Sequence, residues 1–461
     1  MHTSLLPGYT RCMLNQPKSL GRFLTTLATV LFLGVMNAQA ANRYVRAGAA
    51  GAATGADWTN AYATLPATLV RGDVYYIASG NYGTYTFDDA ASGTQVITIK
   101  KATIADHGAS TGWSDAFGVG QAHFACCLEF LSSYWVMDGV MGSMSQTPAD
   151  YGFVIDKPSC SGGYQAITVG NTVGPSFTNF TFSHIYSQAC TQDVEKLFFS
   201  SGYQIGQVDN VTISHCLLDR WQNGMMSRGQ GNGTNDNWIW EYNIGLNGAS
   251  TPANHGEWIN ANSLPLVNTI VRYSLFKGAA GGQTATIVGN NSDLIGAKVY
   301  GNVFDGVDTG NGIIAGTSVA NLVNAEVYNN TFLNSIAQMG WINGYNGTGN
   351  VAYNNVLYNM DATVGNGVAH SNNSYFQTTN TPAETNRQTG SGNPFVNSVG
   401  GNYRLAAATS PGMTLSSLYA LDPDGTTRGA DGTWDRGAYE YVSGGVSVTL
   451  APMAPRGLAF R

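Results

Sequence analysis

The sequence predicts an all-β protein, and more specifically a single-domain parallel β-helix. Three observations lead there: the composition, a repeat of 25–31 residues, and short β-type runs inside each repeat. Of 461 residues, 58 are Gly and only 11% are charged, against roughly 7% Gly and roughly 25% charged residues in average proteins. An aromatic content of 11% excludes a disordered chain. A net charge of −7 excludes nucleic-acid binding through a broad basic surface.

The repeat consists of six-residue segments with apolar first and sixth positions and, most often, Asn at the fourth. The marker at the fourth position steps by 27, 31, 28, 28 and 25 residues through Cys216, Asn243, Ser274, Asn302, Asn330 and Asn355. Periods of this length are typical of solenoids and propellers, but a propeller blade needs four strands in roughly 40–45 residues. Two or three runs of about five residues instead fit one coil of a β-helix. An Asn marker suits a bend, because Asn tolerates unusual backbone angles and can hydrogen-bond to the next coil.

The first forty residues have the features of a secretory signal peptide. Lys18 and Arg22 precede the uncharged stretch 23–36, and Ala38-Gln39-Ala40 resembles a cleavage site. We therefore expect export to the periplasm or medium, with an uncleaved membrane anchor as the alternative. Cleavage would lower the net charge to −10 and leave five cysteines, an odd number. The neighbours Cys126 and Cys127 are not expected to pair with each other, and the cysteines are expected to be mostly buried, with one or two disulfides.

Both ends of the remaining chain resemble a known family. The segments concerned are Tyr44–Gly48, Gly55–Trp58, Gly72–Ile77, Gly80–Tyr82, Asp422–Gly425, Arg428 and Asp435–Tyr441. They are similar to the opening and close of exported right-handed parallel β-helix proteins with a pectate-lyase-like fold. The resemblance implies an N-terminal cap and first coils over 41–100, coils over 101–394 and a C-terminal end over 395–441. Residues 442–461 look like a linker. The resemblance implies an architecture and no particular activity.

The repeat alignment also predicts which side chains meet on successive coils, about 4.8 Å apart. Lys277 should lie beside Asp305, and Glu241 beside Arg272 as an exposed ion pair. A column of tyrosines should either stack on sugar rings or pack across coils. This column contains Tyr300, Tyr328 and Tyr353.

Polar residues gather just before and within the second strand of several coils. The cluster comprises Asp193, Glu195, Lys196, Arg220, Asn223, Arg228, His255, Glu257 and Gln283. We predict that His255, Glu257, Arg228 and the more distant Lys277 border one groove. His255, Glu257 and Lys277 are the candidate catalytic residues. The candidate substrate-binding residues are Arg228, Arg220, Asn223 and Arg272, and no ligand set for a metal is identified.

Many enzymes with this architecture cleave acidic polysaccharides by β-elimination, which needs a base and a partner that neutralises the uronate carboxylate. Here His255 or Arg228 would neutralise the carboxylate, Lys277 would take the proton, and Glu257 would orient His255 or hold a cation. Ca²⁺ is the one cofactor that this chemistry could use. The alternatives are a glycoside hydrolase using carboxylates such as Glu195 and Glu257, or a non-catalytic glycan-binding or surface structural β-helix. We expect a monomer whose partner is a polysaccharide, with no nucleic acid and no membrane attachment after cleavage.

Overall fold

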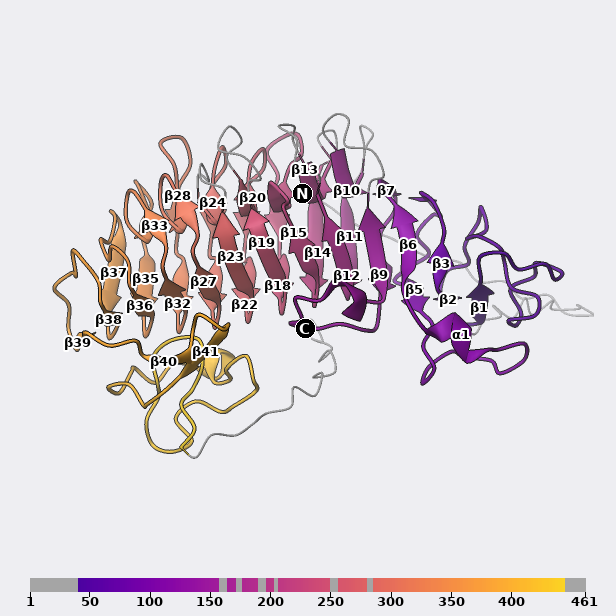
Figure 1. Ribbon diagram of the computed structural model, residues 1–461. Coiled ribbons are helices and arrows are strands. Elements are labelled where there is room, and N and C mark those ends of the chain that lie inside the picture. Colours follow the sequence, from indigo (N-terminus) through magenta and orange to yellow (C-terminus); the bar gives the residue numbers. More distant parts are fainter. Residues whose placement is uncertain are drawn as a thin grey trace, which may run out of the picture. The chain divides into compact units, whose positions relative to one another are not determined.

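The chain folds into stacked coils formed by three long parallel sheets (Figure 1). The computed structural model describes residues 40–156, 164–170, 176–189, 196–202, 206–248, 256–279 and 285–443, all within one compact unit that begins at Ala40. Helix is scarce in these residues. It is limited to α1 (Asp115–Gly118) and the 3₁₀ turns η1 (Pro148–Asp150) and η2 (Ser417–Tyr419).

Sheets A and B have twelve strands each and sheet C has nine. Sheet A comprises β1 (Asn42–Val45), β2 (Val74–Ile77), β5 (Ile97–Lys101), β8 (Trp135–Asp138), β11 (Phe177–Ser183), β14 (Val208–Ser214), β18 (Ile239–Glu241), β22 (Ile270–Arg272), β26 (Lys298–Tyr300), β31 (Glu326–Tyr328), β35 (Asn350–Tyr353) and β37 (Val368–Ser371). Sheet B comprises β3 (Gly80–Asn81), β6 (Ala122–Ala125), β9 (Phe153–Asp156), β12 (Ile185–Gln188), β15 (Leu217–Asp219), β19 (Ile244–Gly248), β23 (Leu275–Ala279), β27 (Val303–Asp305), β32 (Thr331–Leu333), β36 (Val356–Tyr358), β38 (Ser374–Phe376) and β39 (Gln388–Gly390). Sheet C comprises β4 (Thr86–Phe87), β7 (Leu128–Phe130), β10 (Tyr164–Val169), β13 (Lys196–Ser201), β16 (Asn223–Ser227), β20 (Glu257–Ala261), β24 (Ile287–Gly289), β29 (Ile314–Ala315) and β34 (Ile342–Asn343).

Successive coils pair strand on strand in parallel, which confirms the predicted β-helix. The chain passes through sheets A, B and C and then returns to sheet A one coil further on. Sequence alignment gave the register correctly, since Lys277 pairs with Asp305 and Glu241 with Arg272. Shorter pairings, not predicted from the sequence, add to the coils. They are β17 (Asn235–Asp236), β21 (Leu266–Val267), β25 (Leu294–Ile295) and β30 (Leu322–Val323) in one sheet, and β28 (Asp308–Thr309) with β33 (Ile336–Ala337) in another.

The Asn markers form a ladder at the bend between sheets A and B, as predicted. Each marker's backbone N–H donates to the side chain of the marker one coil later, from Asn243 to Ser274 (3.1 Å), Ser274 to Asn302 (3.0 Å), Asn302 to Asn330 (3.0 Å) and Asn330 to Asn355 (2.9 Å). The left-handed residue of the bend is the one before each marker. Asn is therefore needed at the marker for its amide, since the unusual backbone angle belongs to the preceding residue.

Aromatic side chains stack along the interior of the coils. Phe276, Phe304 and Phe332 are fully buried, with ring centroids 5.0 and 4.8 Å apart and nearly parallel planes. These are the sixth positions of the repeat, which the sequence predicted to point inward. In these three coils the repeat thus supplies one inward aromatic each, and the rings stack across the coils.

The C-terminal segment, residues 395–441, folds back beside the later coils instead of adding another one (Figure 1). It opens with an antiparallel hairpin, β40 (Phe395–Asn397) and β41 (Asn402–Leu405). The motif Asp435–Tyr441, which resembles the C-terminal end of the family, then holds the segment in place. Arg436 donates to the Asn373 carbonyl oxygen (3.0 Å), and the Asp435 carboxylate accepts from the Thr409 and Tyr441 N–H groups (2.7 and 3.0 Å).

Two expectations from the sequence need correction. Cys126 and Cys127 form a disulfide with each other, so adjacency did not prevent pairing. The Glu241–Arg272 pair is not an exposed ion pair, because its side chains are only 18% and 20% exposed. Cys216 is buried as a free thiol, while Cys160 and Cys190 lie outside the described residues.

Candidate functional site

A groove of 490 Å³ runs over the outer face of sheet C. Its described lining is rich in hydrogen-bonding side chains, with one carboxylate, Glu257, and the hydroxyls of Thr317 and Ser318. Amides dominate the rest of the polar lining: Gln222, Asn223, Asn260, Asn262, Asn290, Asn291 and Asn311. Such a surface offers both donors and acceptors and suits a polyhydroxylated ligand.

A local irregularity in sheet C places Glu257 and Asn260 on the same side. The N–H groups of Trp258 and Ile259 both donate to the Thr286 carbonyl oxygen, at 2.9 and 3.1 Å. Two residues on β20 therefore face one residue, Thr286, directly before β24, as in a β-bulge. Both Trp258 and Ile259 are buried in the core, and the residues on either side of them line the groove.

Three polar side chains form the floor of the groove. Asn223 on β16 pairs with Glu257 on β20, and the Asn260 side-chain amide donates to Glu257 Oε2 (3.0 Å). The exposed fractions of Asn223, Glu257 and Asn260 are 1%, 2% and 0%. The carboxylate is thus held in place by neutral amides at the bottom of the groove.

The described residues do not fit a calcium site. Ca²⁺ takes 6–8 oxygen ligands, several of them commonly carboxylates. The described part of the chain has no group of three or more His, Cys, Asp or Glu side chains placed to hold a metal ion. Glu257 is the only carboxylate among the described lining residues of the groove. No catalytic step is therefore assigned to a metal, and the predicted use of Ca²⁺ stays a prediction.

Of the predicted site residues, the structure brings Asn223 and Glu257 together. His255 lies outside the described residues, as do Asp193, Glu195 and Gln283. Lys196 begins β13 and is buried, with its backbone N–H donating to Gln222 Oε1 (3.2 Å).

Lys277 and Arg228 do not line this groove, which corrects the predicted arrangement. Lys277 lies on β23 in sheet B, with its Nζ 3.8 Å from Asp305 Oδ2. Arg228 directly follows β16. Asn223 is the first residue of that strand, so the two residues lie at its opposite ends. Arg228 is 1% exposed, and its backbone N–H donates to Ser201 Oγ (2.6 Å). The prediction combined columns from different sheets, so it could not tell which columns share a face.

Arg272 and Arg220 also lie elsewhere. Arg272, on β22 in sheet A, donates to Glu241 Oε2 (2.7 Å) and to the Tyr300 hydroxyl (2.9 Å). Burial alone would lower the pKa of Arg272, but Glu241 and Tyr300 hold it above its ordinary value. Arg220 occupies the turn after β15, with its Nε 3.2 Å from Asp219 Oδ2.

The tyrosine column is not an open platform for sugars. Tyr300 and Tyr328 are 1% and 8% exposed and pack in one cluster with Tyr419 and Trp434 of the C-terminal segment. The rings of Tyr328 and Tyr353 stack across coils with centroids 5.6 Å apart. Of the two alternatives, the structure supports aromatic packing.

The sequence reasoning missed Asn260 and the asparagines from the neighbouring coils. Only the segments around the A–B bend were aligned in register, and the last strand of each coil was not. Register in sheet C, where Asn260 pairs with Met226 and Val288, would have placed Asn260 beside Met226, which also lines the groove. The bulge hides this, because it interrupts the alternation of inward and outward residues.

No known family profile and no curated protein matches the sequence. Solved structures do match in fold. The pectate lyase Pel9A is 13% identical with a TM-score of 0.47, over 87% of this chain and 96% of that chain. The PL6 family polysaccharide lyase Pedsa3628 from Pseudopedobacter saltans is 15% identical with a TM-score of 0.30, over 76% and 94%. The PL6 family alginate lyase AlyGC is 10% identical with a TM-score of 0.29, over 69% and 50%.

The chain is a parallel β-helix. Identities of 10–15% show no shared activity.

Proposed function

We propose that the chain is an exported polysaccharide lyase that binds an acidic polysaccharide in the sheet C groove. The observation that carries the proposal is the buried Glu257 at the floor of a groove lined by amides. Amide N–H groups can donate to a uronate carboxylate, which stabilises the negative charge that develops when the α-proton leaves. Glu257, held by Asn260, is the described group placed to accept that proton.

The proposed step balances without a further reactant. The uronate C5–H bond breaks and its proton passes to Glu257, while the electron pair forms a C4=C5 double bond. The C4–O bond to the next sugar then breaks, and the leaving oxygen takes a proton from Glu257 or from water. The products are a new hydroxyl end and an unsaturated uronate end.

Two features favour elimination over hydrolysis. Glycoside hydrolysis in most families needs two carboxylates on opposite sides of the bond, whereas Glu257 is the only carboxylate among the described lining residues. A row of amides also suits a substrate that carries carboxylates, because each N–H is a donor. The mature chain's negative charge opposes a polyanion, so local amide donors would have to supply the recognition.

The test is a panel of acidic and neutral polysaccharides, assayed with and without Ca²⁺. The panel contains pectate, alginate, hyaluronan, galactan and a β-glucan. The proposal expects absorbance near 235 nm from unsaturated uronate ends with an acidic polymer. Glu257→Gln should lower the rate by about 10²–10⁴-fold, the usual contribution of a general acid–base group.

Asp308→Asn on β28 is the matched control and should keep full activity. New reducing ends without absorbance near 235 nm would show that the chain is a hydrolase and not a lyase. Polymer binding without any product would favour the non-catalytic alternative. Full activity in Glu257→Gln would place the chemistry elsewhere, and Lys277→Met would then test the base predicted from the sequence.

A further inference from the structure

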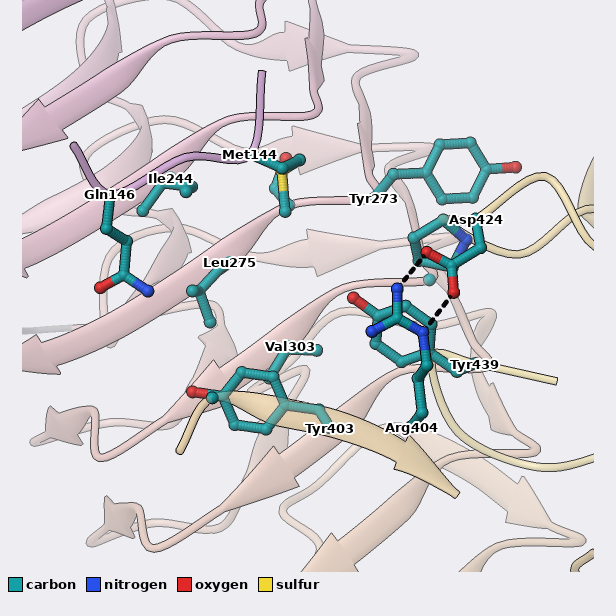
Figure 2. Close-up of a pocket in the computed structure, with 14 residues that line it drawn as sticks. Met144, Gln146, Ile244, Tyr273, Leu275, Val303, Tyr403, Arg404, Asp424 and Tyr439 are labelled. Carbon is teal, nitrogen blue, oxygen red and sulfur yellow. Dashed lines mark hydrogen bonds and ion pairs between the residues drawn. The ribbon is translucent and has the colours of Figure 1, made fainter. Parts of the chain in front are cut away.

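A second concave site lies on sheet B, separate from the groove on sheet C. We call it the flank pocket; it has a volume of 170 Å³ (Figure 2). Its aliphatic part comes from Ile244, Leu275 and Val303, on the neighbouring strands β19, β23 and β27. The rest of its lining comes from the 144–146 loop on one side and from the C-terminal segment on the other.

The outer face of sheet B explains why a pocket forms at this place. Its aliphatic column packs in one cluster with Tyr151 before β9 and with Phe395 and Leu405 of the C-terminal hairpin. Ile244 and Leu275 line the pocket between these two covering parts. Ile244, Leu275 and Val303 are 1%, 6% and 3% exposed, so the apolar floor of the pocket is small and is bordered by polar groups.

The polar side of the pocket is preorganised. Arg404 donates from Nε and Nη2 to the two carboxylate oxygens of Asp424, at 2.6 and 2.7 Å, and these bonds are drawn in Figure 2. The Arg404 guanidinium also lies over the Tyr439 ring, 5.1 Å from its centroid. The Tyr403 hydroxyl donates to Asp305 Oδ2 (2.8 Å), which fixes a further aromatic wall.

Size and charge together define the ligand. The volume is below the roughly 300–1,000 Å³ of pockets for drug-sized ligands, so a single ring fits better than a chain. Arg404 and Asp424 are the charged side chains in the described lining and neutralise each other. An aliphatic floor beside donors and acceptors matches a ring with one apolar face and a hydroxylated edge.

We propose that the flank pocket binds one neutral sugar ring, such as a branch or terminal residue of the polysaccharide. The inference shares with the proposed function only the premise that the ligand of the chain is a glycan. Arg404 would donate to a ring hydroxyl and Asp424 would accept from its neighbour, while the ring's C–H face lies on Leu275. The pocket would anchor the polymer on a face different from the one that cleaves it.

The test is a ligand-observed NMR titration of the full chain. The neutral probes are methyl β-galactoside and methyl β-glucoside, and the acidic probe is methyl galacturonoside. We expect one neutral probe to bind with a dissociation constant of about 1 mM, typical of a ligand of this size. Binding should be insensitive to salt, and the acidic probe should bind at least tenfold more weakly.

Two variants locate the binding. Arg404→Met combined with Asp424→Asn should weaken it at least tenfold. Gln146→Trp, on the exposed lip of the pocket, should weaken it similarly without disturbing the core, and Gln95→Trp at another exposed position is its control. The proposal is overturned if neither neutral probe binds, if both variants bind as well as the parent chain, or if the acidic probe binds best.

Glu257→Gln separates this proposal from the proposed function. It should keep the binding of the neutral probe while losing cleavage. Binding that survives in a chain cleaving none of the acidic polymers would overturn the lyase and leave the pocket standing.

Discussion

Replacing Asn330 by Ala tests the ladder that joins one coil to the next. The side chain is fully buried. Its Oδ1 accepts from the Asn302 N–H (3.0 Å), and its Nδ2 donates to the Val299 carbonyl oxygen (2.8 Å). Ala removes these two bonds, together with those to the Asn302 side chain, the Tyr328 carbonyl oxygen and the Asn355 side chain. It leaves the Asn302 N–H and the Val299 carbonyl oxygen, both buried, each short of a partner. At about 1–1.5 kcal/mol for each of these two backbone groups, the free energy of unfolding should fall by at least about 2–3 kcal/mol.

The assay is urea unfolding of the parent chain and its variants, followed by circular dichroism. Asn291→Ala, at an exposed position in the groove, is the control and should cost less than about 0.5 kcal/mol. Asn330→Asp keeps the acceptor but loses the donor, so it too should destabilise the chain. A loss in Asn330→Ala no larger than that in the Asn291 control would refute the argument that the ladder stabilises the coils.

Three further predictions concern the core, pH and export. Phe304→Ala removes the middle ring of the buried stack and should cost about 3–5 kcal/mol in the same unfolding assay. Burial raises the pKa of Glu440 to about 7 from 4.5. The stability linked to its protonated form is therefore fully present below about pH 4.5 and is lost as the pH rises through 7, a change of about 3 kcal/mol. Glu440→Gln should flatten this part of a melting-temperature profile between pH 4.5 and 7, and an unchanged slope would contradict the assignment. Finally, Edman sequencing of the exported protein should begin at Ala41, and a start at Met1 or Met13 would contradict cleavage there.

The sequence predicted the parts of the fold that repeat locally. Asn302 and Asn330 occupy the same place in successive segments, so their ladder could be predicted from spacing alone. The pairing of Lys277 with Asp305 followed for the same reason. The inward direction of Phe304 followed from the position it shares with its neighbours. In a solenoid each coil contacts mainly the next one, so local spacing carries most of the architecture.

The candidate site was less predictable because it depends on features outside the six-residue segments that define the repeat. Because of the bulge at Trp258, Asn260 faces the same way as Glu257. The bulge forms where the Trp258 and Ile259 N–H groups share one acceptor on the next coil. Tyr403 and Arg404 reach sheet B only because the C-terminal segment folds back. That contact joins residues about a hundred positions apart, such as Tyr403 and Asp305. No periodicity marks such a contact.

The helices among the described residues are α1 and two 3₁₀ turns, and none of them could span a membrane. The predicted signal peptide, residues 1–40, falls almost wholly outside them. The test of export is therefore the N-terminal sequencing described above, because no feature of the coils bears on it.

The most direct test of the central claim is a crystal structure of the Glu257→Gln variant with an acidic oligosaccharide from a polymer that the parent chain binds. Cleavage in the sheet C groove predicts sugar density along β16, β20 and β24. A uronate carboxylate should lie within hydrogen-bond reach of the groove amides, and its C5 should face residue 257. An oligosaccharide bound over sheet A or sheet B, with the sheet C groove empty, would contradict the account.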